Sequence, residues 1–233
     1  FKDGAFGMSL DLSSVYDHKT PTHEMKELLK ILGNSKRILS THIRNVGESI
    51  LDSLKEISDF TREYNLNAEI SHFQPIEEFI NFYEKALEMI EDKSININFD
   101  VYPFDVTAIP LYSFLPTWMR EKTKEAMVEF SNNPDYERQI LEFLENFQGK
   151  EIIIGRLSDS SLKISEGKSV REFAENSGLG FSKGFLRLMR ITRLKGVLFY
   201  RNVDMKTLEK FICHDKAIIS SNGASLGERE FKH

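Results

Sequence analysis

The chain has 233 residues, of which 40% are hydrophobic and 29% charged, a composition typical of one globular domain with a sizeable core. Its formal net charge is −5 and its lysines and arginines form no basic run, which argues against nucleic acid as a partner. No apolar run is long enough to cross a membrane, no signal-peptide pattern opens the sequence, and the single Cys213 excludes an internal disulfide and favours the cytoplasm.

In the first half of the chain, apolar segments of strand length alternate with segments of helical periodicity. Strands are expected at 4–12, 37–43, 68–73 and 95–104, with helices between them at about 20–33, 50–60 and 79–90. The Pro in Thr20-Pro21 is typical of a helix start, and Gly33 of a helix end. This alternation predicts βαβ units and therefore an α/β fold with a parallel sheet.

Residues 105–150 interrupt this alternation of strands and helices. Two helices in succession are expected in "LPTWMREKTKEAMVEF" and "PDYERQILEFLENF", so we predict a helical insertion there. Strand character resumes at 151–157, 196–202 and 217–223, with a short helix at "MKTLEKFI" before the last strand. Ser169 and Glu172 have the spacing of a capping box, which predicts a helix start at "VREFAENSG".

Histidines end two successive predicted strands: His42 in "RILSTHIRN" and His72 in "NAEISHFQP". In parallel α/β folds, ligands bind at the carboxyl ends of the strands, and neighbouring strands lie about 4.8 Å apart. Two imidazoles at the same height could therefore share one metal ion. The alternative is a pair of hydrogen-bonded histidines with a structural role. Tyr102, at the end of the next strand, is a candidate substrate contact.

Seven short motifs occur in one order along the chain: "GAFGMS", "STHIRN", "EISHF", "FDVYPF", "LPTW", "GKSVREFAENSG" and "IISSNG". In that order they resemble the N-acyl-D-amino-acid deacylases (D-aminoacylases) of the amidohydrolase superfamily, over nearly the whole chain. The resemblance implies a zinc-dependent (β/α)8 TIM-type barrel that cleaves the N-acyl group from D-amino acids. The partner would then be a small N-acyl amino acid.

The resemblance also implies roles for single residues. His42 and His72 match two histidines that bind zinc in the family. Tyr102 matches a tyrosine that contacts the substrate. Asn222 stands at the position of the family's catalytic aspartate, but its amide cannot take a proton from water as a carboxylate does.

Arg44 and Gln74 complete the expected substrate-binding residues. Gln74 stands where the family often has a lysine that pairs with the substrate carboxylate. With Asn222 in place of the aspartate, this departure leaves two hypotheses open. The chain belongs either to a zinc amide hydrolase or to a non-catalytic or weakly active relative. Hydrolysis of another amide, such as a cyclic ureide, is a further possibility on fold analogy alone.

The sequence opens on Phe1 rather than Met, directly before an apolar run. The family's H-x-H strand and metal-binding cysteine would lie upstream of Phe1. We therefore expect residues 1–233 to be the C-terminal part of a metal-dependent hydrolase barrel domain, a partial barrel with roughly its last five strands.

Overall fold

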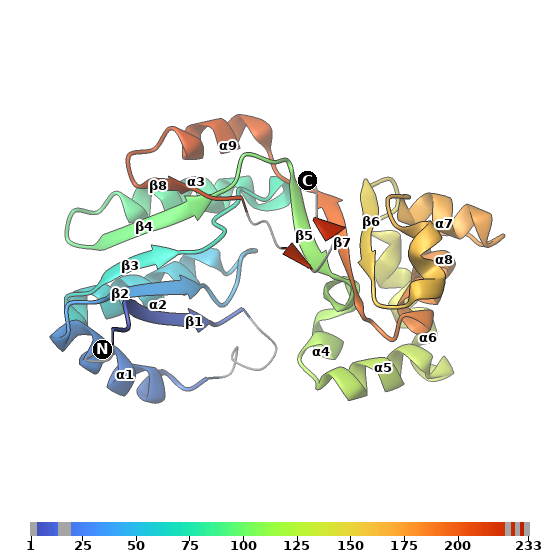
Figure 1. Ribbon diagram of the computed structural model, residues 1–233, viewed down its shortest axis with the longest axis horizontal. Helices are drawn as coiled ribbons and strands as arrows, with labels where there is room; N and C mark the ends of the chain where they lie inside the picture. Colours follow the sequence, from blue (N-terminus) through green and yellow to red (C-terminus); the bar gives the residue numbers. More distant parts are fainter. Residues whose placement is uncertain (1–3, 14–19, 222–224, 227–228, 231–233) are drawn as a thin grey trace. The chain divides into compact units, whose positions relative to one another are not determined.

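The computed structural model describes residues 4–13, 20–221, 225–226 and 229–230. The chain divides into two compact units (Figure 1). Unit 1 consists of Phe1–Asp105 and Val203–His233, and unit 2 is the continuous segment between them, Val106–Asn202. A search of the described ranges finds no helix with the length and apolar character needed to cross a membrane.

Unit 1 is built on a five-stranded sheet with the order β1-β2-β3-β4-β8, and every neighbouring pair of strands is parallel. The strands are β1 (Gly7–Asp11), β2 (Ile38–His42), β3 (Asn67–Ile70), β4 (Asn96–Val101) and β8 (Ala217–Ile219). The predicted α/β fold with a parallel sheet is thus confirmed.

Four helices of unit 1 pack against this sheet because alternate strand residues are apolar. Leu39, Ile70 and Phe99 are fully buried in the core that the sheet forms with the helices. The helices are α1 (Thr22–Asn34), α2 (Ile50–Tyr64), α3 (Ile80–Ile90, preceded by the 3-10 helix η1, Glu77–Phe79) and α9 (Met205–Ile212). A short antiparallel pair, β9 (Ser225–Leu226) and β10 (Arg229–Glu230), also belongs to this unit.

The other residues of the same strands are polar. Ser40, Glu69 and Asp100 alternate with the buried apolar residues and therefore point away from the helices. In register, Ser40 lies opposite Glu69, and Asp100 lies near the carboxyl end of β4. The face of the sheet that is turned away from the helices is thus lined by groups that can form hydrogen bonds and ion pairs.

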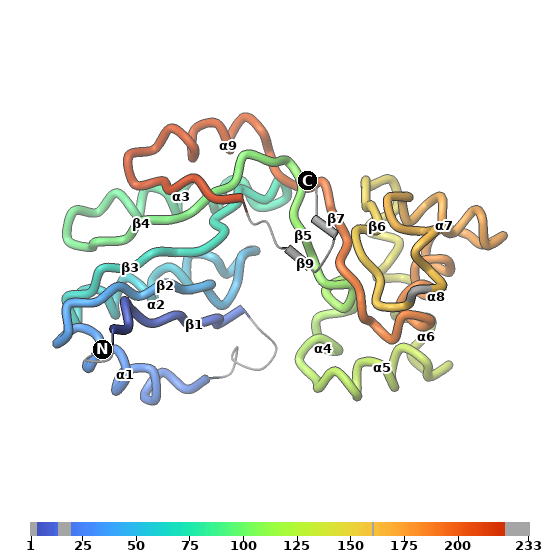
Figure 2. Tube along the Cα trace, viewed as in Figure 1, coloured from blue at the N-terminus to red at the C-terminus, as the bar shows by residue number. Residues whose placement is uncertain are grey.

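Unit 2 is built on an antiparallel sheet with the order β5-β7-β6 (Figure 2). Its strands are β5 (Val106–Pro110), β6 (Ile152–Leu157) and β7 (Gly196–Arg201). Its helices are η2 (Leu111–Phe114), α4 (Thr117–Arg120), α5 (Lys124–Asn132), α6 (Pro134–Glu145), η3 (Ser160–Ser165), α7 (Val170–Asn176) and α8 (Phe181–Ile191). Phe114 lies at the centre of its core, in ring contact with Phe147, Phe185 and Tyr200.

Unit 2 differs in two respects from what the sequence pattern indicates. The predicted strands 151–157 and 196–202 do form, but they pair antiparallel with each other instead of joining the parallel sheet. Their third partner, β5, lies at the start of segment 105–150, for which the sequence pattern indicated two helices and no strand. Strand periodicity identifies a strand but not its partner, and β5 pairs with a strand about ninety residues further along the chain. The capping box of α7 is confirmed by hydrogen bonds in both directions between Ser169 and Glu172.

The chain leaves and re-enters unit 1 at adjacent points. The backbone N–H of Val203 donates to the carbonyl of Asp105 at 3.3 Å, and that of Asp204 donates to the carbonyl of Pro75 at 3.1 Å. Ile76 and Val203 also form an isolated antiparallel bridge. The two ends of unit 2 are therefore joined through backbone hydrogen bonds within unit 1.

Candidate functional site

The two histidines predicted as metal ligands lie side by side. His42 is the last residue of β2, and His72 follows β3, the neighbouring parallel strand. Their ring centroids are 4.9 Å apart, with an angle of 67° between the ring planes. Because Leu39 and Thr41 face the helices, the alternation of the strand turns His42 to the opposite, polar face.

The backbone of His72 has a left-handed conformation, with φ of 57°. A residue with a Cβ atom adopts this conformation at a cost of about 1–2 kcal/mol. The N–H of Gln74 donates to the carbonyl of His72 at 2.8 Å and closes a tight turn after β3. Strained backbone of this kind is concentrated at functional sites, so its occurrence at a predicted ligand is informative.

A carboxylate from the next strand holds the ring of His72. The Nδ1 atom of His72 lies 3.2 Å from Oδ1 of Asp100, and the hydroxyl of Ser220, just after β8, donates to the same oxygen at 2.7 Å. Burial acts to raise the pKa of Asp100, but the hydrogen bonds from His72 and Ser220 outweigh it and hold that pKa at about 2. Asp100 is therefore ionised and can only accept hydrogen bonds.

A second carboxyl group, that of Glu69, contacts Asp100. The hydroxyl of Ser40 donates to Oε2 of Glu69 at 2.7 Å, and that of Ser71 donates to the same oxygen at 3.1 Å. Burial raises the pKa of Glu69 above its usual value and the adjacent Asp100 raises it further, against the effect of Ser40. Glu69 therefore holds a proton more tightly than Asp100 does.

His42 is held in its neutral form. Burial lowers the pKa of His42, and the neighbouring His72 lowers it further, while Asp11 and Asp100 act weakly in the opposite direction. A neutral imidazole keeps a lone pair on one ring nitrogen, and this lone pair is what binds a metal ion.

The spacing of the two rings fits two ligands of one zinc ion. With Zn–N distances of about 2.0–2.1 Å and tetrahedral angles, two coordinating imidazoles have centroids about 5 Å apart. The observed 4.9 Å agrees with this value. Within the described parts of the chain, no third His, Cys, Asp or Glu completes a metal-binding group with them. His42 and His72 therefore fit half of a zinc site.

Tyr102 and Gln74 lie beside the histidines in different roles. The ring centroid of Tyr102 is 5.9 Å from that of His72. Gln74 is 2% exposed, and its side-chain amide accepts from the N–H of Tyr102 and donates to the carbonyl of Tyr102, both at 3.0 Å. The buried amide thus fixes the backbone that carries Tyr102. A substrate contact by either residue stays a prediction.

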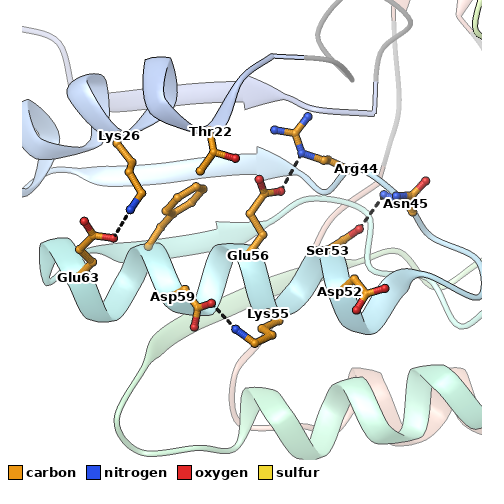
Figure 3. A pocket seen from close by; sticks show the side chains of 11 residues that line it. Thr22, Lys26, Arg44, Asn45, Asp52, Ser53, Lys55, Glu56, Asp59 and Glu63 are labelled. Carbon is orange, nitrogen blue, oxygen red and sulfur yellow. Dashed lines mark hydrogen bonds and ion pairs between the residues drawn. The ribbon is translucent and has the colours of Figure 1, made fainter.

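Arg44 lies against the helices of unit 1. Its guanidinium forms an ion pair with Glu56 of α2 at 2.8 Å and donates to the carbonyl of Thr20 at 2.9 Å. Figure 3 shows this pair in a groove of about 480 Å³ between α1 and α2, where Lys26 also pairs with Glu63. A substrate contact by Arg44 likewise stays a prediction.

Asn222, the predicted catalytic position, falls outside the residues that the structure describes. The structure adds polar groups that the sequence pattern did not single out, among them Glu69 and Ser220. Glu69 had a visible signal, because it is a charged residue inside the apolar strand "AEI". Ser220 had none, since its contact with Asp100 joins segments 120 residues apart.

No family model matches the sequence, and no curated protein matches it. Solved structures do match. The N-acyl-D-glutamate deacylase of Bordetella bronchiseptica, complexed with zinc and a phosphonate that mimics the tetrahedral intermediate, superposes on 94% of this chain with a TM-score of 0.67 and 15% identity. A D-aminoacylase described as defining a novel subset of amidohydrolases superposes on 95% of it, with a TM-score of 0.62 and 18% identity.

Another D-aminoacylase structure, which concerns the role of the enzyme's binuclear metal centre, has a TM-score of 0.61 and 18% identity over 95% of this chain. The present chain covers 40% of the length of each of these proteins. It therefore has the fold of one part of a D-aminoacylase, and the predicted resemblance is confirmed at the level of the fold.

Proposed function

We propose that this chain is part of a zinc-dependent hydrolase that cleaves the amide bond of N-acyl-D-amino acids within a (β/α)8 barrel. The observation that carries the proposal is the pair of His42 and His72, with rings 4.9 Å apart at neighbouring strand ends. The fold likeness to an N-acyl-D-glutamate deacylase and to a D-aminoacylase supports the substrate class. A cytoplasmic location suits the single free Cys213.

In this proposal, His42 and His72 would hold the metal through neutral imidazole nitrogens. Zinc, when bound, lowers the pKa of a water ligand to about 7 and polarises a carbonyl group. Asp100 keeps His72 in place through Nδ1. Tyr102, whose ring is adjacent to that of His72, would contact the acyl amino acid. The resemblance gives Asn222 the position of the catalytic aspartate.

The alternative is a protein that binds N-acyl amino acids and turns them over slowly or not at all. One observation favours it: both polar ends of the Gln74 amide are engaged by the backbone of Tyr102, so this position offers no cation to a substrate carboxylate. Asn222 would also supply no general base, a group that typically contributes about 10²–10⁴-fold in rate.

Zinc content and turnover of the full-length protein test the proposal together. We expect bound zinc and release of free amino acid from N-acetyl-D-amino acids, both lost in the double variant His42→Ala, His72→Ala. His214→Ala is the matched control, because His214 lies after α9, where its Nε2 is 3.4 Å from a carboxylate oxygen of Glu91. Zinc content that is the same in the double variant and the wild type would contradict the proposal. Bound substrate without turnover would favour the alternative.

A further inference from the structure

We infer that Asp100 is a positioning residue that sets the tautomer of His72, and that Ser220 and Glu69 hold Asp100 in place for this purpose. The inference deepens the proposed function, on which its metal-binding part rests. A neutral imidazole can carry its proton on either ring nitrogen, and only the other nitrogen can bind a metal ion. The partner of one nitrogen therefore decides which nitrogen is available.

The geometry decides this choice at His72. Oδ1 of Asp100 lies 3.2 Å from Nδ1, and a carboxylate accepts hydrogen bonds without donating them. The proton of the neutral ring is thus on Nδ1, and the lone pair is on Nε2. The left-handed backbone of His72 and the turn to Gln74 fix the position from which the ring projects.

Asp100 is itself fixed from two sides. The hydroxyl of Ser220 donates to the same Oδ1 at 2.7 Å, and the backbone N–H of Ser220 donates to the carbonyl of Val101 at 2.9 Å. On the other side, the carboxyl group of Glu69 contacts Asp100 and is itself held by Ser40 of β2. Glu69 of β3, His72 after β3 and Ser220 after β8 thus contact this aspartate of β4, and Ser40 of β2 supports it through Glu69.

This arrangement has the form of a carboxylate–histidine pair that supports a metal ligand, in which the loss of the outer partner typically weakens metal binding 10–100-fold. If the hydrogen bond were only structural, removing Asp100 would lower the stability of the protein and have no other effect. The two roles differ in a property of the metal-free protein, the tautomer of His72, which can be measured directly.

The test is long-range ¹H–¹⁵N NMR of ¹⁵N-histidine-labelled, metal-free full-length protein at a pH where the imidazoles are neutral. We expect the Nδ1–H tautomer for His72 in the wild type and in Asp100→Asn, whose amide oxygen still accepts. In Asp100→Ala we expect a mixture dominated by Nε2–H, the form that imidazole side chains prefer in water. Asp92→Ala is the matched control, because Asp92 lies after α3 and pairs with Arg62 at 2.7 Å, and it should leave the tautomer of His72 unchanged.

Zinc titration of the same variants gives the second measurement, with an expected 10–100-fold loss of affinity in Asp100→Ala and less than twofold in Asp92→Ala. An Nε2–H tautomer in the wild type overturns the inference, even if Asp100→Ala does not fold. An unchanged tautomer in a folded Asp100→Ala overturns it as well. A wild type that binds no zinc refutes the proposed function, while the tautomer still decides the role of Asp100.

Discussion

At the scale of single residues, the contact between Glu69 and Asp100 places two carboxyl groups where only one is readily ionised. Ionisation of Glu69 in the folded chain requires a second negative charge beside Asp100 in a half-buried site. The same ionisation is easy in the unfolded chain, near the usual pKa of 4.5. This difference links the stability of unit 1 to pH.

We expect Glu69→Gln to flatten the dependence of stability on pH. The pKa of Glu69 is raised in the folded state, so between its unfolded and folded values the folded chain binds more protons and stability falls as pH rises. Glutamine remains neutral and can still accept from Ser40. Urea unfolding of the metal-free protein from pH 4 to 8 measures the effect, with Glu142→Gln on the exposed face of α6 as control. Equal slopes for wild type and Glu69→Gln would show that Glu69 ionises normally.

We expect Asn222→Asp to raise the hydrolysis of N-acetyl-D-amino acids by roughly tenfold or more, mainly in kcat, because a carboxylate restores a general base. Asparagine and aspartate have nearly the same shape, so packing should change little. The gain should require zinc and disappear when His72 is also replaced by Ala. A fast wild type that Asn222→Asp slows would mean that Asn222 is not at the position of the base.

At the scale of elements, local patterns predicted the helices and strands of unit 1 well because these elements follow one another in space as they do in the sequence. "ILSTH" and "AEI" alternate with period two, and α1 and α2 repeat with helical period. The same logic placed His42 and His72 together. Local patterns did not predict β5 or the hydrogen bond from Ser220 to Asp100. Both depend on contacts between residues about a hundred positions apart in the sequence.

The packing of α7 on α8 leads to a prediction at this scale. A Cβ atom at Gly184 would lie 2.2 Å from Cβ of Ala174, so Gly184→Ala forces the two helices apart. We expect it to destabilise unit 2 by about 1–3 kcal/mol, as measured by urea unfolding. The double variant Gly184→Ala, Ala174→Gly removes the contact with Cβ but leaves the added Cβ 2.5 Å from Cα of residue 174, so it should recover only a small part of the loss. A single variant as stable as the wild type would contradict the close approach of these helices.

At the scale of the whole molecule, the two units differ in how their sequence is arranged. Unit 2 is continuous and has its own core, in which Leu111, Phe185 and Leu198 are fully buried. Unit 1 is interrupted, and the side chains of Leu208 and Phe211 from its second segment are fully buried in its core. Residues 106–202 therefore contain all of one core, whereas residues 1–105 lack part of the other.

We expect residues 106–202, expressed alone, to unfold in one cooperative transition, as followed by circular dichroism. Residues 1–105 alone should show no such transition, because they lack β8 and α9. A cooperative transition in 1–105 and none in 106–202 would mean that the cores are divided differently from what the structure shows.

The hydrogen bond between Asp105 and Val203 has a consequence for the order of events during synthesis on the ribosome. Unit 1 cannot be completed until α9 and β8 emerge, and by then all of unit 2 has been made. A folded unit 2 brings residues 105 and 203 together in advance, so the closure entropy for the returning segment is close to that of a short turn. An unfolded unit 2 leaves a long flexible loop instead. During synthesis, β1–β4 are thus made before unit 2 and cannot pair with β8 until unit 2 has also been made. Whether unit 2 has folded by then determines the entropy cost of bringing β8 to β4.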